Sequence, residues 1–117
     1  WKAQVYRLAR RIPDLPIPNR PSGIVDLYDV SDDWIPIYDK SDLMGYYQAI
    51  GTSGNQFKTA PVAGAMMAEL IRQVENGYDH DARPLPYKLP HMGLTIDTGM
   101  FHRNRKINKN SSFSVVG

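Results

Sequence analysis

The chain contains no cysteine among its 117 residues. This absence excludes disulfide bridges, zinc sites built on thiolates, and thiol nucleophiles. Long hydrophobic runs are missing too, because every apolar stretch is far shorter than the roughly 18 to 20 residues that cross a bilayer. The sequence therefore predicts a soluble chain with no membrane partner, and we expect it in the cytoplasm.

A strong excess of charge is also lacking. The 14 Lys and Arg residues against 12 Asp and Glu leave a formal charge of +2, so no overall field favours nucleic acid or a membrane surface as a partner. Apolar residues make up 42% of the chain, an ordinary share for a globular protein. Because the sequence begins directly on a helical pattern at Trp1, we interpret it as a fragment of a longer protein.

The N-terminal region predicts a short helix and a stiff connector. Apolar side chains recur at helical spacing from Trp1 to Ile12, and Pro13 ends the pattern. Pro13, Pro16, Pro18 and Pro21 then follow closely, which forbids a helix and favours an extended, polyproline-like chain.

Strand-like runs follow the connector. Residues 23–28 and 34–38 flank an acidic turn, and we expect them to pair as a hairpin, with Pro36 at an edge or a bulge. Asp32 and Asp33 lie in that turn, where Asp is favoured by its hydrogen bonds to the backbone rather than by acid-base work. Residues 45–50 predict a third strand.

The strongest helix signal lies between about residues 60 and 76. Pro61 stands where a helix begins and Gly77 where one ends. Small residues at 64, 65 and 68 predict close packing on a sheet. The expected buried face is Ala63, Met66, Met67, Leu70, Ile71 and Val74.

The C-terminal region, residues 78–117, predicts an irregular extension. Strands are expected at 93–97 and 113–116. His80 has no histidine at helical spacing, so we expect an exposed loop histidine and no metal site. The basic residues are expected to be solvated, because no nucleic-acid motif accompanies them; they are Arg103, Arg105, Lys106 and Lys109.

A glycine-containing loop, residues 51–58, joins the third strand to the long helix. Its backbone N–H groups and the helix end can present positive charge to an electron-rich ligand. A tight strand-to-helix turn accounts for Gly51 and Gly54 as well, so both interpretations stay open. A phosphate loop and a hydrolase nucleophile elbow are excluded, because each lacks a required glycine.

Two stretches carry a resemblance to a known family. They read LYDVSDDWIPI over residues 27–37 and GYYQAIGTSGNQFKTAPVAGAMMAELI over residues 45–71. This order resembles the C-terminal portion of FAD-dependent oxidoreductases of the D-amino acid oxidase superfamily, particularly the glycine oxidase, sarcosine oxidase and dimethylglycine dehydrogenase branch. The resemblance is close from Gly23 to about Arg72.

The resemblance implies an α+β fold, with antiparallel strands of a substrate domain and the last strand and helix of an FAD-binding domain. Residues 1–77 would form this part of the enzyme and residues 78–117 its extension. The nine glycines form no G-x-G-x-x-G fingerprint, so the site for the FAD pyrophosphate must lie upstream. The upstream FAD-binding segment is therefore an expected partner.

The resemblance also implies site residues. Lys58 matches a lysine that holds the substrate carboxylate or the flavin edge, and Tyr28 matches an aromatic position on the substrate side. Asn55 and Gln56 replace the His-Gly of the family, while Asp26 stands where some sarcosine oxidases tether flavin to a cysteine. The residues matched to the flavin edge are Gly51, Thr52, Ser53, Gly54, Asn55, Gln56, Phe57 and Lys58.

The implied activity is hydride transfer from the carbon beside an amine to FAD, with an amino acid or an N-methylated glycine derivative as substrate. One alternative is a non-catalytic binding or regulatory domain that keeps this scaffold. Another is phosphate or RNA binding through the basic tail, which would show steep salt dependence. The isolated fragment is expected to be inactive, to bind FAD weakly and to self-associate through apolar surface.

Overall fold

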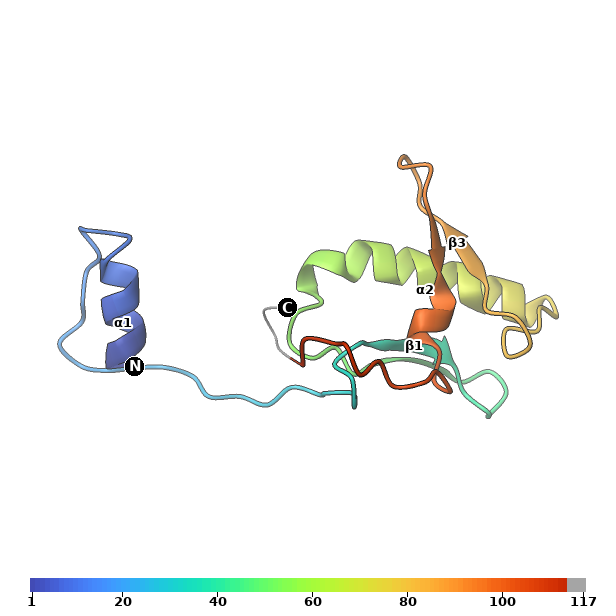
Figure 1. Cartoon of the computed structure of the whole chain (residues 1–117), viewed down its shortest axis with the longest axis horizontal. Coiled ribbons are helices and arrows are strands. Elements are labelled where there is room, and N and C mark those ends of the chain that lie inside the picture. The colour runs from blue at the N-terminus through green and yellow to red at the C-terminus, as the bar shows by residue number, and fades with distance from the viewer. Residues whose placement is uncertain (114–117) are drawn as a thin grey trace.

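The computed structural model describes residues 1–113 as an α+β chain (Figure 1). Its two sheets are both antiparallel and two-stranded, β1–β2 and β3–β4. The predicted α+β class is therefore confirmed for these residues. In chain order the elements are α1 (Lys2–Ala9), β1 (Ile37–Lys40), β2 (Tyr47–Ile50), η1 (Phe57–Thr59), α2 (Ala60–Glu75), β3 (Pro86–Lys88), β4 (Thr95–Asp97) and η2 (Thr98–Phe101).

Helix α1 stands apart from the other elements, at the end of a long extended segment (Figure 1). It is shorter than the helix predicted over residues 1–12, although the amides of Arg11 and Ile12 still donate to the Leu8 carbonyl at 2.8 and 2.9 Å. None of its residues is buried. The segment from residue 15 to residue 22 holds no helix or strand, as the proline spacing predicts.

The predicted hairpin between residues 23–28 and 34–38 is wrong. Strand β1 pairs instead with β2, with Ile37 opposite Ile50 and Lys40 opposite Tyr47. The connecting loop is short and closes through the Ser41 amide, which donates to the Tyr46 carbonyl at 2.8 Å. Trp34 has a φ of 62° and Pro36 has no amide N–H, so residues 34–36 do not continue β1 toward a pairing with residues 23–28.

Helix α2 confirms the helix predicted over 60–76. Met66 and Leu70 are buried, and the other four residues of the predicted face are half-buried. The predicted packing of the small residues on a sheet is wrong, because Gly64, Ala65 and Ala68 are exposed. The larger side chains of the helix are the ones that face the strands.

Strands β3 and β4 pair with Tyr87 opposite Ile96. The strand predicted over 93–97 is thus confirmed from Thr95 to Asp97. The strand predicted over 113–116 lies outside the described residues except for Phe113, which is in no strand. The C-terminal region therefore contains regular structure, and the division of the chain at residue 77 stays a prediction.

The core is small and centres on Tyr38 of β1. Tyr38, Met66 and Tyr87 are buried together, so that β1, α2 and β3 meet there. The ring centroids of Tyr38 and Phe101 lie 5.3 Å apart. Within residues 1–113, no helix has both the length and the apolar character needed to cross a membrane.

Candidate functional site

The glycine loop has an unusual backbone. Gly51, Ser53 and Gly54 all have positive φ angles, of 66°, 53° and 76°. A positive φ is costly for a residue with a side chain, so Ser53 needs local support. Ser53 is fully buried, and its Oγ donates to the Gly51 carbonyl at 3.1 Å.

The segment just before β1 holds this loop in place. The Asp29 carboxylate accepts hydrogen bonds from the amides of Gly51 and Thr52, the latter at 3.2 Å, and from the Thr52 hydroxyl at 2.9 Å. The Asp29 carbonyl also accepts from the Ser53 amide at 2.9 Å. These hydrogen bonds, that from the Thr52 hydroxyl first, lower the pKa of Asp29.

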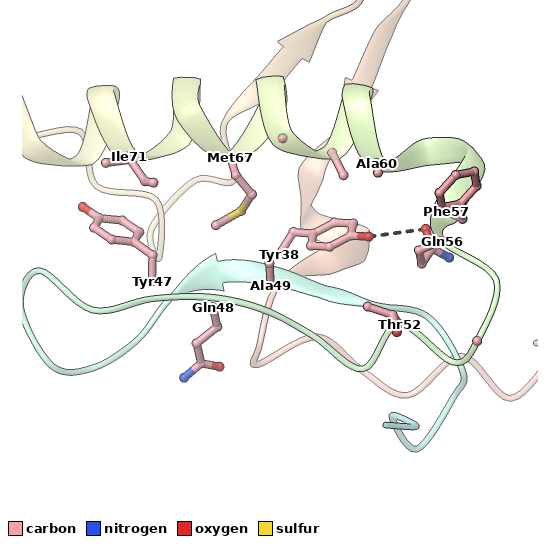
Figure 2. A pocket seen from close by; sticks show the side chains of 13 residues that line it. Tyr38, Tyr47, Gln48, Ala49, Thr52, Gln56, Phe57, Ala60, Met67 and Ile71 are labelled. Carbon is pink, nitrogen blue, oxygen red and sulfur yellow. Dashed lines mark hydrogen bonds between the residues drawn. The ribbon is translucent and has the colours of Figure 1, made fainter. Parts of the chain in front are cut away.

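A cleft of about 660 Å³ opens beside the loop, between the β1–β2 sheet and α2 (Figure 2). Its walls are mainly apolar and aromatic, and no charged side chain among the described residues lines it. The lining side chains include Tyr38, Tyr47, Phe57, Met67 and Ile71, together with the polar Gln48, Thr52 and Gln56. Such a site suits an uncharged, flat ligand with a few polar edge atoms.

Four of the eight residues predicted for the flavin edge lie at this cleft. Thr52, Gly54, Gln56 and Phe57 line it, whereas Gly51 and Ser53 are buried and do not. The flavin-edge interpretation predicts that the amides of residues 54–58 converge on an open concavity. The structure has a cleft beside these residues, but the Asn55 amide does not face it as a free donor, because it donates within the loop to the Thr52 carbonyl at 3.4 Å.

The two residues predicted as catalytic lie outside the cleft lining. Lys58 is exposed on η1 and does not border the cleft. Tyr28 is half exposed and lies against Gly54, since a Cβ added at Gly54 would lie 3.3 Å from its ring. Only a residue without a side chain fits there at this spacing.

Two tyrosines at the cleft escaped sequence reasoning. The Tyr38 hydroxyl donates to Gln56 Oε1 at 3.3 Å (Figure 2), and burial raises the pKa of Tyr38. The Tyr47 hydroxyl donates to Glu75 Oε1 at 2.6 Å. Burial, and then this carboxylate, raise the pKa of Tyr47 to about 12. The only available signal was their place in strand-like runs, which is equally typical of core tyrosines.

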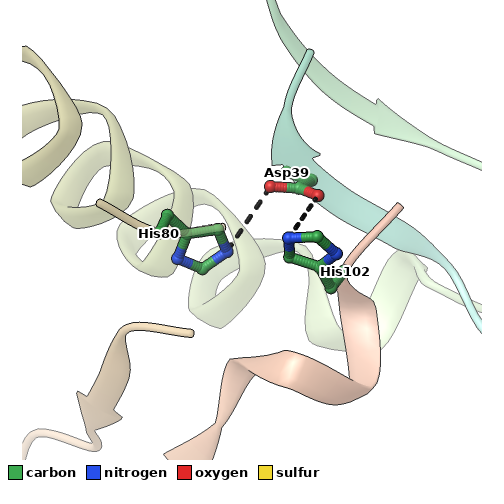
Figure 3. Close-up of side chains that lie close together, drawn as sticks. All are labelled: Asp39, His80 and His102. Atoms are coloured by element: carbon green, nitrogen blue, oxygen red, sulfur yellow. Dashed lines mark ion pairs between the residues drawn. The ribbon is translucent and has the colours of Figure 1, made fainter. Parts of the chain in front are cut away.

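A second cluster corrects the expectation for His80. This residue is fully buried rather than exposed, and His102 lies beside it with ring centroids 5.4 Å apart. Both rings face the buried Asp39 of β1 (Figure 3). The Nε2 atoms of His80 and His102 lie 3.4 and 3.6 Å from the Asp39 carboxylate oxygens. The fold therefore places His102 beside His80.

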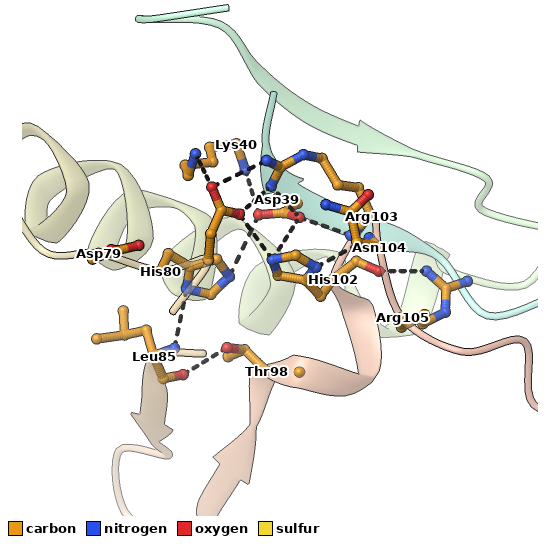
Figure 4. Close-up of polar contacts among 12 residues, drawn as sticks. Asp39, Lys40, Asp79, His80, Leu85, Thr98, His102, Arg103, Asn104 and Arg105 are labelled. Atoms are coloured by element: carbon orange, nitrogen blue, oxygen red, sulfur yellow. Dashed lines mark hydrogen bonds and ion pairs between the residues drawn. The ribbon is translucent and has the colours of Figure 1, made fainter. Parts of the chain in front are cut away.

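The hydrogen bonds of the two histidines define their neutral tautomers. His80 Nδ1 accepts from the Leu85 amide and His102 Nδ1 accepts from the Asn104 amide, both at 3.0 Å (Figure 4). An accepting Nδ1 leaves the proton on Nε2, which points toward Asp39. Metal-ligating histidines instead donate through the other ring nitrogen. The three side chains are close enough to hold a metal ion. In these tautomers, however, the proton on Nε2 prevents that nitrogen from binding the ion.

Burial lowers the pKa of His80, which favours its neutral form. Its Nε2 makes no hydrogen bond within the part of the chain that is described. The contact with Asp39 at 3.4 Å is therefore an electrostatic one. The cluster joins β1 to the segments around residues 80 and 102 and does not border the cleft.

The expectation of a solvated basic tail is wrong for two arginines. The Arg103 amide donates to Asp39 at 2.7 Å (Figure 4), and its guanidinium pairs with Asp81 and Asp42, at 2.6 Å each. Arg105 binds the buried Asp33 through two nitrogens, at 2.6 and 3.1 Å. Buried carboxylates need such partners. Lys106 and Lys109 are exposed, as predicted.

These pairings also give Asp33 its role. The Arg105 guanidinium holds the pKa of Asp33 well below its usual range, so this carboxylate stays ionised and bound. Asp32 is exposed in the same turn. The turn interpretation of both residues thus fits their surroundings better than acid-base chemistry does.

The cleft is the better candidate for binding a ligand, because the polar cluster is filled by its own contacts. The cleft combines aromatic walls, three polar side chains and a loop of special backbone shape. Comparison of the chain with protein-family models, with curated proteins and with solved structures finds no match.

Proposed function

We propose that this chain is the C-terminal part of a cytoplasmic FAD-dependent oxidoreductase that oxidises an amino acid or an N-methylated glycine-type amine. The observation that carries the proposal is the cleft beside residues 51–57, since the residues that resemble the flavoenzyme family are the ones that form its loop wall. The oxidase superfamily named above remains the proposed family.

The character of the cleft supports a flavin ring as its ligand. Its volume of about 660 Å³ lies within the range of small-molecule sites. The flavin ring is flat, largely apolar on its faces and polar along its pyrimidine edge. Tyr38 and Met67 offer apolar surface, and Thr52 and Gln56 offer hydrogen-bonding groups nearby. The residues present therefore fit the group.

The loop-to-helix junction supports the same assignment. The chain passes through η1 directly into α2, whose N-terminal end carries a partial positive charge. Such an end stabilises a nearby anion by about 0.5 to 2 kcal/mol. When bound, the flavin would supply the hydride acceptor, and no residue of this chain needs to act as the base. The work of the chain is to orient the ring.

The proposed roles of Lys58 and Tyr28 are less direct. Lys58 follows the loop with an exposed side chain, so we assign it to a substrate carboxylate brought in by the rest of the enzyme. Tyr28 backs Gly54 and keeps that part of the loop close to the preceding segment. Exposed apolar residues support contact with an upstream FAD-binding segment; Ile24, Val25 and Leu27 are each more than nine-tenths exposed.

The proposal is tested with a variant of the full-length protein in which a larger side chain occupies the cleft. Gly64 lines the cleft from α2, and a Cβ added there meets no atom within 4 Å. In Gly64→Leu we expect the larger side chain to enter the cleft and weaken FAD binding at least about tenfold, a loss of about 1.4 kcal/mol. The measurements are the flavin absorbance of the purified protein and the dissociation constant for FAD.

Ala68→Leu is the matched control. Ala68 lies one turn further along α2, is exposed and does not line the cleft. This variant is expected to keep its flavin. Full occupancy in the Gly64→Leu variant would contradict the placement of flavin in this cleft. A wild-type protein that is purified colourless and gains no flavin on reconstitution would favour the non-catalytic binding domain.

A further inference from the structure

We propose that Asp29 is a positioning residue, which sets the shape of the loop at residues 51–54 and through it one wall of the cleft. The link from this loop to flavin rests on the function proposed above. The control of the loop by Asp29 rests on contacts alone. Asp29 lies outside the cleft lining, so it acts through the residues that it binds.

Asp29 contacts the loop with both its side chain and its backbone. One carboxylate oxygen accepts from two successive amides, those of Gly51 and Thr52, and the other accepts from the Thr52 hydroxyl at 2.9 Å. The Asp29 carbonyl accepts from the Ser53 amide at 2.9 Å. One residue therefore binds three consecutive residues of the loop.

The neighbours of Asp29 reinforce this contact. Val30 forms an isolated antiparallel bridge with Thr52. Ser31 lies against Gly51, where an added Cβ would come within 3.1 Å of the Ser31 Cβ, and the Tyr28 ring lies against Gly54 at 3.3 Å. Residues 28–31 thus form a continuous support beneath residues 51–54.

The loop needs this support because Ser53 adopts a backbone conformation that is costly for a residue with a side chain. Three of its four residues have positive φ angles, and one of them is Ser53 rather than glycine. Without partners for the Gly51 and Thr52 amides, an ordinary turn would be preferred. Thr52 and Gly54, two of these four residues, also line the cleft, so a change in the turn would move the cleft wall.

Asp29 also determines which backbone amides of the loop already donate a hydrogen bond within the chain. The amides of Gly51, Thr52 and Ser53 all point at Asp29. Beside the Thr52 side chain, the surface that the loop offers to a ligand is formed by Gly54, Gln56 and Phe57. Asp29 itself does not line the cleft, although its charge, after burial, helps to raise the pKa of Tyr38, which does.

The experiment uses Asp29→Ala and Asp29→Asn in the full-length protein, with Asp32→Asn as the control. Asp32 is an exposed carboxylate three residues further along the same segment. The first measurement is amide hydrogen exchange, by mass spectrometry, of peptides that cover residues 48–57. We expect at least tenfold faster exchange in Asp29→Ala, a smaller change in Asp29→Asn because the amide oxygen still accepts, and none in the control.

The second measurement concerns the cofactor. For Asp29→Ala we expect at least fivefold weaker FAD binding together with a shifted flavin absorption spectrum, at a temperature where the variant is folded. Asp29→Asn should recover most of the affinity. A residue with a merely structural role would lower the melting temperature and leave the spectrum and the affinity of the folded protein unchanged.

The outcomes separate the two proposals. Unchanged exchange at residues 48–57 in Asp29→Ala overturns the positioning role, even if the protein is yellow. Faster exchange with unchanged affinity and spectrum overturns the link between the loop and the flavin. If wild-type protein binds no FAD, the proposed function fails, and the exchange measurement alone still decides whether Asp29 shapes the loop.

Discussion

At the residue scale, two buried histidines of this chain, His80 and His102, lie beside one buried carboxylate. Asp39 is fully buried and receives the amides of Lys40 and Arg103, each at 2.7 Å, with two imidazole rings beside it. A buried carboxylate without partners would cost several kcal/mol. The histidines are therefore explained as part of the environment of Asp39.

The buried His80 makes stability depend on pH. Burial lowers its pKa in the folded chain, while the unfolded chain keeps a value near 6.5. Below about pH 6.5 the unfolded state therefore takes up a proton that the folded state resists, and stability falls as pH falls. The charged or titratable groups around His80 are Asp39, Asp81, Lys40 and His102.

We predict that His80→Asn flattens this dependence, because Asn keeps an acceptor for the Leu85 amide but does not titrate. Between pH 6.5 and 5, wild type should lose up to about 1.4 kcal/mol per pH unit more than the variant. Urea denaturation at several pH values measures this. His91→Asn is the control, since His91 is exposed and has a φ of 69°, which Asn tolerates. A pH profile shared by all three proteins would refute the prediction.

At the element scale, local patterns were predictable and pairings were not. Helix α2 is encoded within one segment, by the spacing of its apolar residues between Pro61 and Gly77, and its prediction is confirmed. The partner of β1 depends on where that strand begins, and the φ of 62° at Trp34 together with Pro36 makes it begin only at Ile37. Residues 23–28 have strand-like composition, but they find no sheet to join among the described residues.

The candidate site was predictable to a similar degree. The loop residues around Gly54 follow from the resemblance, and the cleft lies beside them. Contacts between distant segments were not readable: Arg103 reaches Asp39 across 64 positions and Arg105 reaches Asp33 across 72. From the sequence alone, a basic residue in a polar stretch is predicted to be solvated, because its buried carboxylate partner cannot be identified.

The β1–β2 hairpin provides a test of backbone conformation alone. Gly45 in its loop has a φ of 76°, and a Cβ added there meets no atom within 4 Å. We predict that Gly45→Ala lowers the free energy of unfolding by about 1 kcal/mol, the cost of a left-handed conformation for alanine. Gly23→Ala is the control, because Gly23 also has open space but lacks a positive φ. Equal urea midpoints for the two variants would contradict this account.

At the scale of the whole molecule, the chain is elongated, with extents of 60 × 31 × 27 Å. The elongation arises because α1 lies at the end of the extended connector (Figure 1). The connector carries the apolar residues Ile24, Val25 and Leu27 almost fully exposed. Exposed apolar surface of this kind is typical of an interface.

We predict that the isolated 117-residue chain binds FAD weakly, with a dissociation constant at least about a hundredfold above that of the full-length protein. The chain has no G-x-G-x-x-G fingerprint to hold the pyrophosphate, so only contacts to the ring remain. Titration followed by flavin fluorescence measures this. Tight, stoichiometric binding of FAD by the isolated chain would show that the pyrophosphate site is unnecessary.

The expected self-association of the isolated chain through its exposed apolar residues is measured separately, by analytical ultracentrifugation.

The contact between Asp39 and Arg103 has one more consequence. It ties together two points 64 positions apart, and the glycine loop, α2 and both hairpin turns lie on the chain between them. A chain without cysteine cannot close such a circuit covalently. Here the Asp39 carboxylate and the Arg103 guanidinium close the ring instead, with Oδ2 and Nη1 3.2 Å apart. Every residue that lines the cleft except Tyr38 therefore lies within a ring of chain that an ion pair closes.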